Sequence, residues 1–186
     1  MANMQRRVLM KGAAVGALAF TLGEAEVLLT AREARAQGVP FRLLTAEQAE
    51  TLEALGETLV PGARQAGIAH FVDQQLAGPP GECLLTARVV NVRPPFAGFY
   101  RAALGAVDRT SQAASKQRFA QLGAAEQREF VDRMRQAKLE GWQGPPPPFV
   151  YFVLRSDAVD VVYGTVEGFE RLGVPYMPHI APERRW

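Results

Sequence analysis

The sequence is poor in the residues that usually build a catalytic or metal centre. Among its 186 residues it has one cysteine, Cys83, and two histidines. A single thiol excludes an intrachain disulfide and the thiolate clusters that hold zinc or iron–sulfur groups. A lone cysteine in an exported protein is either buried as a small hydrophobic residue or paired with a second chain. Both alternatives stay open, and the second makes Cys83 a candidate intersubunit thiol.

The motifs of the common enzyme classes are also missing. The chain contains no Gly-x-Ser-x-Gly, His-Glu-x-x-His or Cys-x-x-Cys pattern. Its Gly-rich stretch over residues 12–20 lacks the preceding strand that a dinucleotide site requires. His70 lies on a predicted helix, where a partly buried, hydrogen-bonded histidine is expected rather than a metal ligand. We therefore predict no catalytic residue, no metal site and no cofactor site in this chain, and no enzyme activity of its own.

Two further groups of side chains have ordinary structural interpretations. Carboxylate pairs at helical spacing are typical of solvated helix faces, and clustered aromatic residues are typical of a packed core. The pairs are Asp157 with Asp160 and Glu167 with Glu170, and the aromatic cluster is Phe149, Tyr151 and Phe152.

The chain has little net charge, and its basic excess lies near the N-terminus. It carries 21 Lys and Arg against 19 Asp and Glu; residues 1–36 hold five of the former and three of the latter, which leaves 16 of each in the remainder. A nucleic-acid-binding protein needs a basic stripe, and none is visible. Residues 12–22 form a short apolar segment, and eleven residues cannot cross a hydrocarbon core that requires about 20.

The N-terminal segment has the order of features of an export signal. Gln5-Arg6-Arg7-Val8-Leu9-Met10-Lys11 resembles the twin-arginine pattern, in which Arg6 and Arg7 precede apolar Leu9 and then Lys11. The apolar segment follows, and two glutamates interrupt it, as in a signal peptide rather than a permanent membrane helix. The twin-arginine pathway moves folded cargo, and it would deliver this chain to the periplasm.

A candidate processing site ends this segment. Ala34-Arg35-Ala36 offers small residues at Ala34 and Ala36, with maturation before Gln37, so residues 1–36 are interpreted as the signal segment. The alternative is an amphipathic N-terminal helix with a chance arginine pair, in which residues 24–34 continue the helix and the segment is not cleaved.

The body, residues 37–172, has the spacing of an all-α protein. Thr45-Ala46-Glu47-Gln48 is a capping box that begins an apolar-periodic run, which Pro61-Gly62 ends. We predict a small irregular helical domain of four or five helices around one core. Prolines 145–148 are interpreted as a spacer. Residues 83–92 favour a short strand or an irregular segment, and residues 149–164 could be strand or helix. The predicted helices are 46–60, 67–76, one introduced by Pro94-Pro95, and 124–138.

The C-terminal segment, residues 173–186, is predicted to be an extended docking arm. Its prolines at 175, 178 and 182 exclude a regular helix, and a pre-stiffened segment loses less entropy on binding. The alternative is a strap over the protein's own core. The side chains expected to contact a partner are Tyr176, Met177, Pro178, His179 and Trp186.

Four stretches of the body share one overall pattern with a known family: "LTAEQAETLEALGETLVPGARQAGIAHFVDQQLAGP", "FYRAALGAVD", "RFAQLGAAEQREFV" and "VVYGTVEGFERLGVPYMP". Through them the body as a whole resembles the gluconate 2-dehydrogenase subunit 3 family. These are small subunits of membrane-bound, FAD-dependent sugar, polyol and sugar-acid dehydrogenases. The family's helical character also favours a helix over residues 149–164.

The resemblance implies a role without local chemistry. In that family a large glucose–methanol–choline-type flavoprotein holds FAD and oxidises the substrate, and a multihaem cytochrome c subunit with haem c passes electrons to membrane quinone. The small subunit has no cofactor, assists maturation of the flavoprotein and lends it a twin-arginine signal, which the translocase reads. The expected location is the periplasm, at the cytoplasmic membrane through the complex. The alternative function is a free-standing periplasmic helical protein that binds a small ligand.

Overall fold

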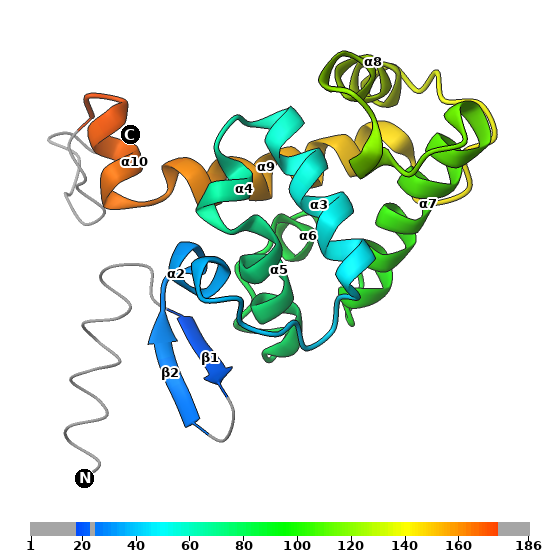
Figure 1. The fold of residues 1–186 in the computed structure, drawn as a ribbon. Coiled ribbons are helices and arrows are strands. Elements are labelled where there is room, and N and C mark those ends of the chain that lie inside the picture. The colour runs from blue at the N-terminus through cyan, green and yellow to red at the C-terminus, as the bar shows by residue number, and fades with distance from the viewer. Residues whose placement is uncertain (1–17, 23–24, 175–186) are drawn as a thin grey trace, which may run out of the picture.

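The computed structural model describes residues 18–22 and 25–174. This part of the chain is a cluster of helices with one small hairpin beside it (Figure 1). In chain order the elements are β1 (Leu18–Leu22), β2 (Ala25–Leu29), α2 (Ala31–Ala36), α3 (Ala46–Leu59), α4 (Ala63–Ala66), α5 (Ile68–Ala77), α6 (Thr86–Val89), α7 (Ala97–Ser115), the 3-10 helix η1 (Phe119–Gln121), α8 (Ala124–Arg135), α9 (Pro147–Tyr163) and α10 (Val166–Arg171).

The prediction of an all-α domain is confirmed. Within the described ranges, five helices have ten residues or more, namely α3, α5, α7, α8 and α9, and four shorter ones connect or extend them. The segment 83–92, for which a strand or an irregular course was expected, contains the four-residue helix α6. No helix in the described ranges is both long enough and apolar enough to cross a membrane.

Helix α3 lies at the centre of the cluster. It contacts α4, α5, α7, α8, α9 and η1, and its Leu52 and Leu55 are completely buried. The predicted capping box begins it: the Thr45 hydroxyl accepts from the Gln48 N–H at 3.2 Å, and the Gln48 amide oxygen accepts from the Thr45 N–H at 3.1 Å. The reciprocal bonds satisfy two donors that the first turn leaves free.

Helix α9 resolves the ambiguity between strand and helix at residues 149–164. It packs against α3, α4, α5, α6, α8 and α10, and Val153 and Leu154 are completely buried. The proline spacer is shorter than predicted, because Pro147 and Pro148 occupy the first turn of the helix. Proline is accepted there since the first turn needs no N–H donors.

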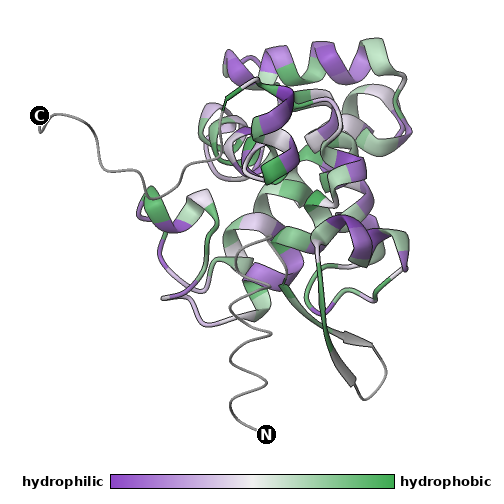
Figure 2. Ribbon diagram, turned by 90° about the vertical axis from the view of Figure 1, so that its left-hand side faces the viewer, coloured by the Kyte–Doolittle hydropathy of each residue, from purple (hydrophilic) through white to green (hydrophobic). Residues whose placement is uncertain are grey.

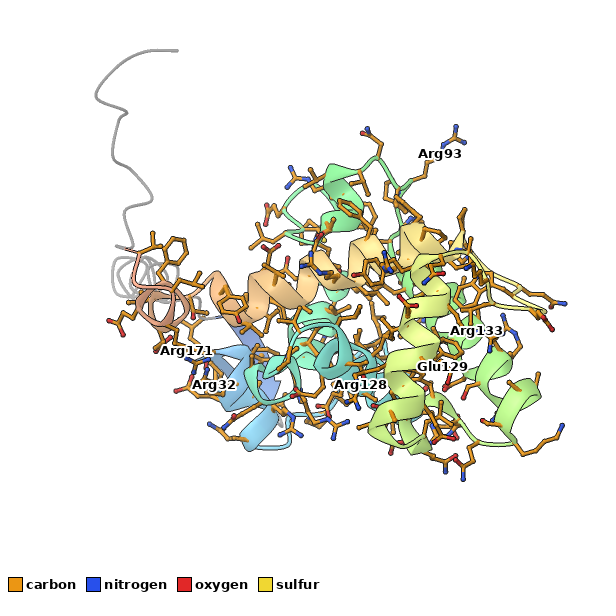
Figure 3. All side chains as sticks on the ribbon, turned by 90° about the horizontal axis from the view of Figure 1, so that it is seen from above. Arg32, Arg93, Arg128, Glu129, Arg133 and Arg171 are labelled. Carbon is orange, nitrogen blue, oxygen red and sulfur yellow. The ribbon has the colours of Figure 1, made fainter. Side chains whose placement is uncertain are left out.

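The outer helices are amphipathic. On α8, Phe130 and Met134 face the core while Arg128 and Glu129 are exposed (Figure 3). Hydrophilic and hydrophobic residues accordingly alternate along this helix, which lies at the top of Figure 2. Burial of one apolar face is what holds such a helix in place.

The described residues upstream of Val39, 18–22 and 25–38, are folded against the body. Strands β1 and β2 form an antiparallel hairpin in which Phe20 pairs with Val27, and α2 packs against α4 and α5. The alternative of a continuous helix through residues 24–34 is wrong for residues 25–29, which are a strand, and holds only from Ala31. A second apolar cluster results, distinct from the main core, made of Phe20, Ala34 and Val39 with Leu18, Val27 and Leu29 around them.

Candidate functional site

Most of the predicted site residues lie outside the described residues. Ala34, Ala36 and Cys83 are described and are placed below. The others are the export residues Arg6, Arg7, Leu9 and Lys11 and the docking residues Tyr176, Met177, Pro178, His179 and Trp186. In residues 18–22 and 25–174, no group of three or more His, Cys, Asp or Glu side chains is arranged to hold a metal ion.

The predicted processing site lies in helix α2. Ala34 is completely buried, and Ala36 is exposed at the end of the helix. Thr30 and Glu33 form a capping box at the start of α2, which satisfies donors that the first turn leaves free. Arg35, between the two alanines, donates from Nε to the Glu53 carboxylate of α3 at 2.9 Å. The cleavage sequence is thus helical and anchored to the body.

Gly67 allows α2 to approach the body closely. It joins α4 to α5 with φ of 85°, a conformation that glycine adopts without steric cost. A Cβ atom added there would overlap the carbonyl group of Ala31. Gly67 is therefore required both by the turn between α4 and α5 and by the close packing of α2. The sequence indicates the turn but not the contact with α2.

His70 on α5 fastens the segment that follows α2. Its Nε2 lies 3.0 Å from the Val39 carbonyl oxygen, and its ring lies 4.5 Å from the ring of Phe41 and 6.5 Å from that of Phe20. Burial lowers the pKa of His70, against the opposing influence of the bond to Val39. The imidazole is buried and hydrogen-bonded, as expected from the sequence, and Nδ1 has no hydrogen-bond partner.

Asp73, one turn further along α5, holds the next residues of the same segment. Its carboxylate accepts from the backbone N–H groups of Arg42 at 2.7 Å, Leu43 at 2.8 Å and Leu44 at 2.8 Å. The side chain is 4% exposed. A buried carboxylate with three backbone donors is a strong anchor, because charge-assisted hydrogen bonds are about twice as strong as neutral ones.

A second buried carboxylate joins α6, α7 and α9. Asp157 of α9 is completely buried; it accepts from the Thr86 N–H at 2.8 Å and from the Tyr100 hydroxyl at 2.6 Å. The prediction that Asp157 belongs to a solvated face is wrong, whereas Asp160 is exposed. Burial raises the pKa of Asp157 to about 6, although its hydrogen bonds oppose the shift. Burial likewise raises the pKa of Tyr100 far above its ordinary value.

These carboxylates have structural partners only, so their geometry supports fold anchoring rather than catalysis. With the geometry established, comparison with known proteins gives one result. The family model described as gluconate 2-dehydrogenase subunit 3 matches residues 46–180. The chain belongs to the gluconate 2-dehydrogenase subunit 3 family. No curated protein and no solved structure matches it.

Membership of the subunit 3 family gives the chain a coarse role. The family name describes an accessory subunit of a multi-subunit gluconate dehydrogenase. The match begins at Ala46, the first residue of α3, and extends beyond α10 into the predicted arm. The contacts of His70 and Asp73 with Val39 and residues 42–44 therefore join family residues on α5 to a segment upstream of the match.

Cys83 lies in the interior of this family member. It is 3% exposed, and burial raises the pKa of its thiol. The Arg88 guanidinium donates to the carbonyl oxygen of Cys83 at 3.0 Å. The burial of Cys83 favours the buried alternative over an intersubunit bond, since a second chain needs an accessible sulfur.

Exposed large apolar side chains occur at three places in the described part of the subunit 3 fold: beside α6, on α9 and after α10. On α9, Phe152 is 50% exposed, so the expectation that it packs in the core is wrong. Leu84 and Val89 flank or end α6 and are 61% and 77% exposed. Leu172 and Val174 follow α10 and are 56% and 49% exposed, immediately at the start of the predicted docking arm. Exposed apolar residues that lead into a segment containing Tyr176, Met177 and Trp186 are consistent with a contact surface.

The buried carboxylate of Asp157 predicts a specific pH dependence of stability. Its folded pKa of about 6 exceeds the ordinary value of 3.8, so between these values the folded state binds more protons than the unfolded state. The stabilisation is fully present below about pH 4 and is lost as the pH rises through about 6. The total loss in the free energy of unfolding is roughly 3 kcal/mol. Asp157→Asn removes this titration, so relative to wild type it should gain stability by that amount from pH 4 to pH 8.

Urea denaturation of both proteins at several pH values measures the difference. Asp160→Asn on the same helix is the matched control. Its difference in stability from wild type should change less with pH, because Asp160 is in contact with water. A difference between wild type and Asp157→Asn that stays constant from pH 4 to pH 8 would contradict the assignment.

Proposed function

We propose that this chain is the non-catalytic small subunit of an FAD-dependent dehydrogenase of the glucose–methanol–choline type. The observation that carries the proposal is the family match over residues 46–180, which covers the helical body and part of the arm. In this proposal the large flavoprotein subunit holds FAD and oxidises the substrate. A multihaem cytochrome c subunit with haem c receives the electrons.

The body suits a carrier role because its buried polar groups serve the fold. Asp73 holds three backbone N–H groups, and Asp157 holds Thr86 and Tyr100. Buried titratable groups at catalytic sites are usually aimed at a cleft, whereas both of these carboxylates are aimed at other parts of the same chain. The chain's contribution to the complex would therefore be made at its surface.

The docking arm is the surface proposed to bind the flavoprotein. Residues 173–186 follow α10, and the exposed Leu172 and Val174 stand at their start. Tyr, Trp and Met are enriched at interfaces, and the arm's prolines reduce the entropy lost on binding. Binding by the arm would assist maturation of the flavoprotein before export.

Export is the second part of the proposal. Arg6 and Arg7 would address the folded complex to the twin-arginine translocase, and the flavoprotein would travel with this chain to the periplasm. Affinity purification of the tagged chain from its host membranes, followed by an absorption spectrum, tests the assembly. A flavin band with a larger partner protein is expected. A colourless monomer would overturn the proposal and favour the free-standing ligand-binding protein instead.

Replacing the arginine pair tests the export role directly. In Arg6→Lys/Arg7→Lys, the flavoprotein is expected to stay in the cytoplasm, with a loss of at least tenfold in periplasmic flavin-linked dehydrogenase activity. The matched control is Arg32→Lys, which changes an exposed arginine of the same segment outside the motif. Cell fractionation with immunoblotting of both subunits is the measurement. Normal periplasmic amounts of the flavoprotein in the double variant would contradict the export role.

A further inference from the structure

The predicted processing site and the folded body use the same residues. Proteases act on exposed and locally unfolded chain, and native proteins are cut mainly at flexible surface segments. Cleavage between Ala36 and Gln37 would require α2 to unwind and the completely buried Ala34 to leave its cluster with Phe20 and Val39. The segment on either side is also fastened, by the hairpin upstream and by His70 and Asp73 downstream.

We propose that the folded body shields the Ala34-Arg35-Ala36 site from proteases. A chain that has folded then keeps the residues upstream of Gln37. The segment from Leu18 to Val39 is then a permanent structural element rather than a discarded leader. This inference deepens the proposed export role, because a pathway that carries folded cargo would present the site already closed. Its test uses the purified chain and so can fail independently of export.

Four independent contacts carry the proposal. Ala34 is buried against the body, Arg35 is paired with Glu53 at 2.9 Å, and the Val39 carbonyl is held by His70. The fourth contact is the backbone of Ala31, which lies so close to Gly67 that no side chain fits between them. Arg32, by contrast, points away from the body on the exposed side of α2 (Figure 3).

Two glycines offer a matched pair of variants. Gly67→Ala introduces a methyl group that overlaps the Ala31 carbonyl, and it also strains a backbone with φ of 85°. Gly62→Ala strains a similar backbone with φ of 95°, but nothing lies within 4 Å of the added Cβ. Both variants carry the cost of positive φ, and only Gly67→Ala displaces α2.

Trypsin is the probe, because Arg35–Ala36 is a tryptic bond inside the predicted site. The purified full-length chain is treated with limiting trypsin, and the fragment that begins at Ala36 is followed by intact mass. When opening is fast relative to cleavage, the rate reports the population of the open form. We expect Gly62→Ala to be cut at the wild-type rate and Gly67→Ala at least ten times faster.

Two results would overturn the proposal: a wild-type chain cut after Arg35 as fast as Gly67→Ala, or equal acceleration in Gly62→Ala and Gly67→Ala. Circular dichroism establishes that each variant is helical. If Gly67→Ala does not fold, Glu53→Gln is the deciding variant. It removes the charge that holds Arg35 and should accelerate cleavage after Arg35 several-fold. An unchanged rate in Glu53→Gln would then count against a closed site.

Discussion

Asp157→Ala is expected to lower the free energy of unfolding by about 3–5 kcal/mol near pH 4, where the buried carboxyl group is protonated. The substitution leaves the Thr86 N–H and the Tyr100 hydroxyl without their acceptor in a fully buried site. Each buried donor left unsatisfied costs about 1–3 kcal/mol, and the small cavity adds to this. At neutral pH the loss should be smaller by roughly 3 kcal/mol, because the wild type then bears the cost of a buried charge. For a chain of this length the loss near pH 4 should lower the melting temperature by roughly 6–20 °C.

Urea denaturation followed by circular dichroism measures the loss. Asp160→Ala is the matched control, since it removes the same side chain from an exposed position on the same helix and should change stability by less than about 0.5 kcal/mol. The loss of stability in Tyr100→Phe should lie between those of Asp157→Ala and Asp160→Ala, because this variant removes one of the two hydrogen bonds to Asp157. Equal losses in Asp157→Ala and Asp160→Ala would show that Asp157 does not anchor α6.

Asp73→Ala is expected to cost about 3–4 kcal/mol and to loosen the segment that follows α2. Three backbone N–H groups, of Arg42, Leu43 and Leu44, lose one charged acceptor. Hydrogen bonds to charged groups contribute about 1.5–3 kcal/mol each, but neighbouring water will satisfy part of the loss at the less buried positions. Urea denaturation gives the total, and amide hydrogen exchange of residues 42–44 shows whether the loss is local.

Asp73→Asn separates the charge from the geometry. The asparagine oxygen can still accept from Leu43 and Leu44, while its NH₂ group faces the Arg42 N–H, so about half of the loss is expected. If Asp73→Ala left the exchange of residues 42–44 unchanged, the three hydrogen bonds would not be what holds this segment.

The helical body could be predicted wherever local signals agreed with tertiary packing. Thr45 and Gln48 marked the start of α3, and Pro61-Gly62 marked its end within two residues. The apolar spacing at Phe130, Val131 and Met134 located α8 in the same way. These features depend on residues close together in the sequence, which is why composition and spacing were enough. Helix α9 needed the family resemblance, because Phe, Tyr and Val favour strands by propensity.

The anchors could not be predicted because their partners lie far apart in the sequence. Asp157 is 57 residues from Tyr100 and 71 from Thr86. One signal was available: Asp157 is four residues after Val153 and four before Val161, which places it on the buried stripe of α9. The hairpin was missed for a different reason. Strands β1 and β2 have only five residues each, LAFTL and AEVLL, and an isolated hairpin is marginal without the body to pack against.

The close packing of α2 against Gly67 affects how this protein should be produced for laboratory study. A recombinant chain begun at Gln37, as a processed form would be, or at Ala46, where the family match starts, lacks α2 and the hairpin. Gly67 and the neighbouring apolar residues of α4 and α5 would then meet solvent, and a newly exposed apolar surface favours self-association. In the chain begun at Ala46, His70 would also lose its contacts with Val39 and Phe41. An expression plasmid that retains the codons from Leu18 onward preserves the natural cover of that surface.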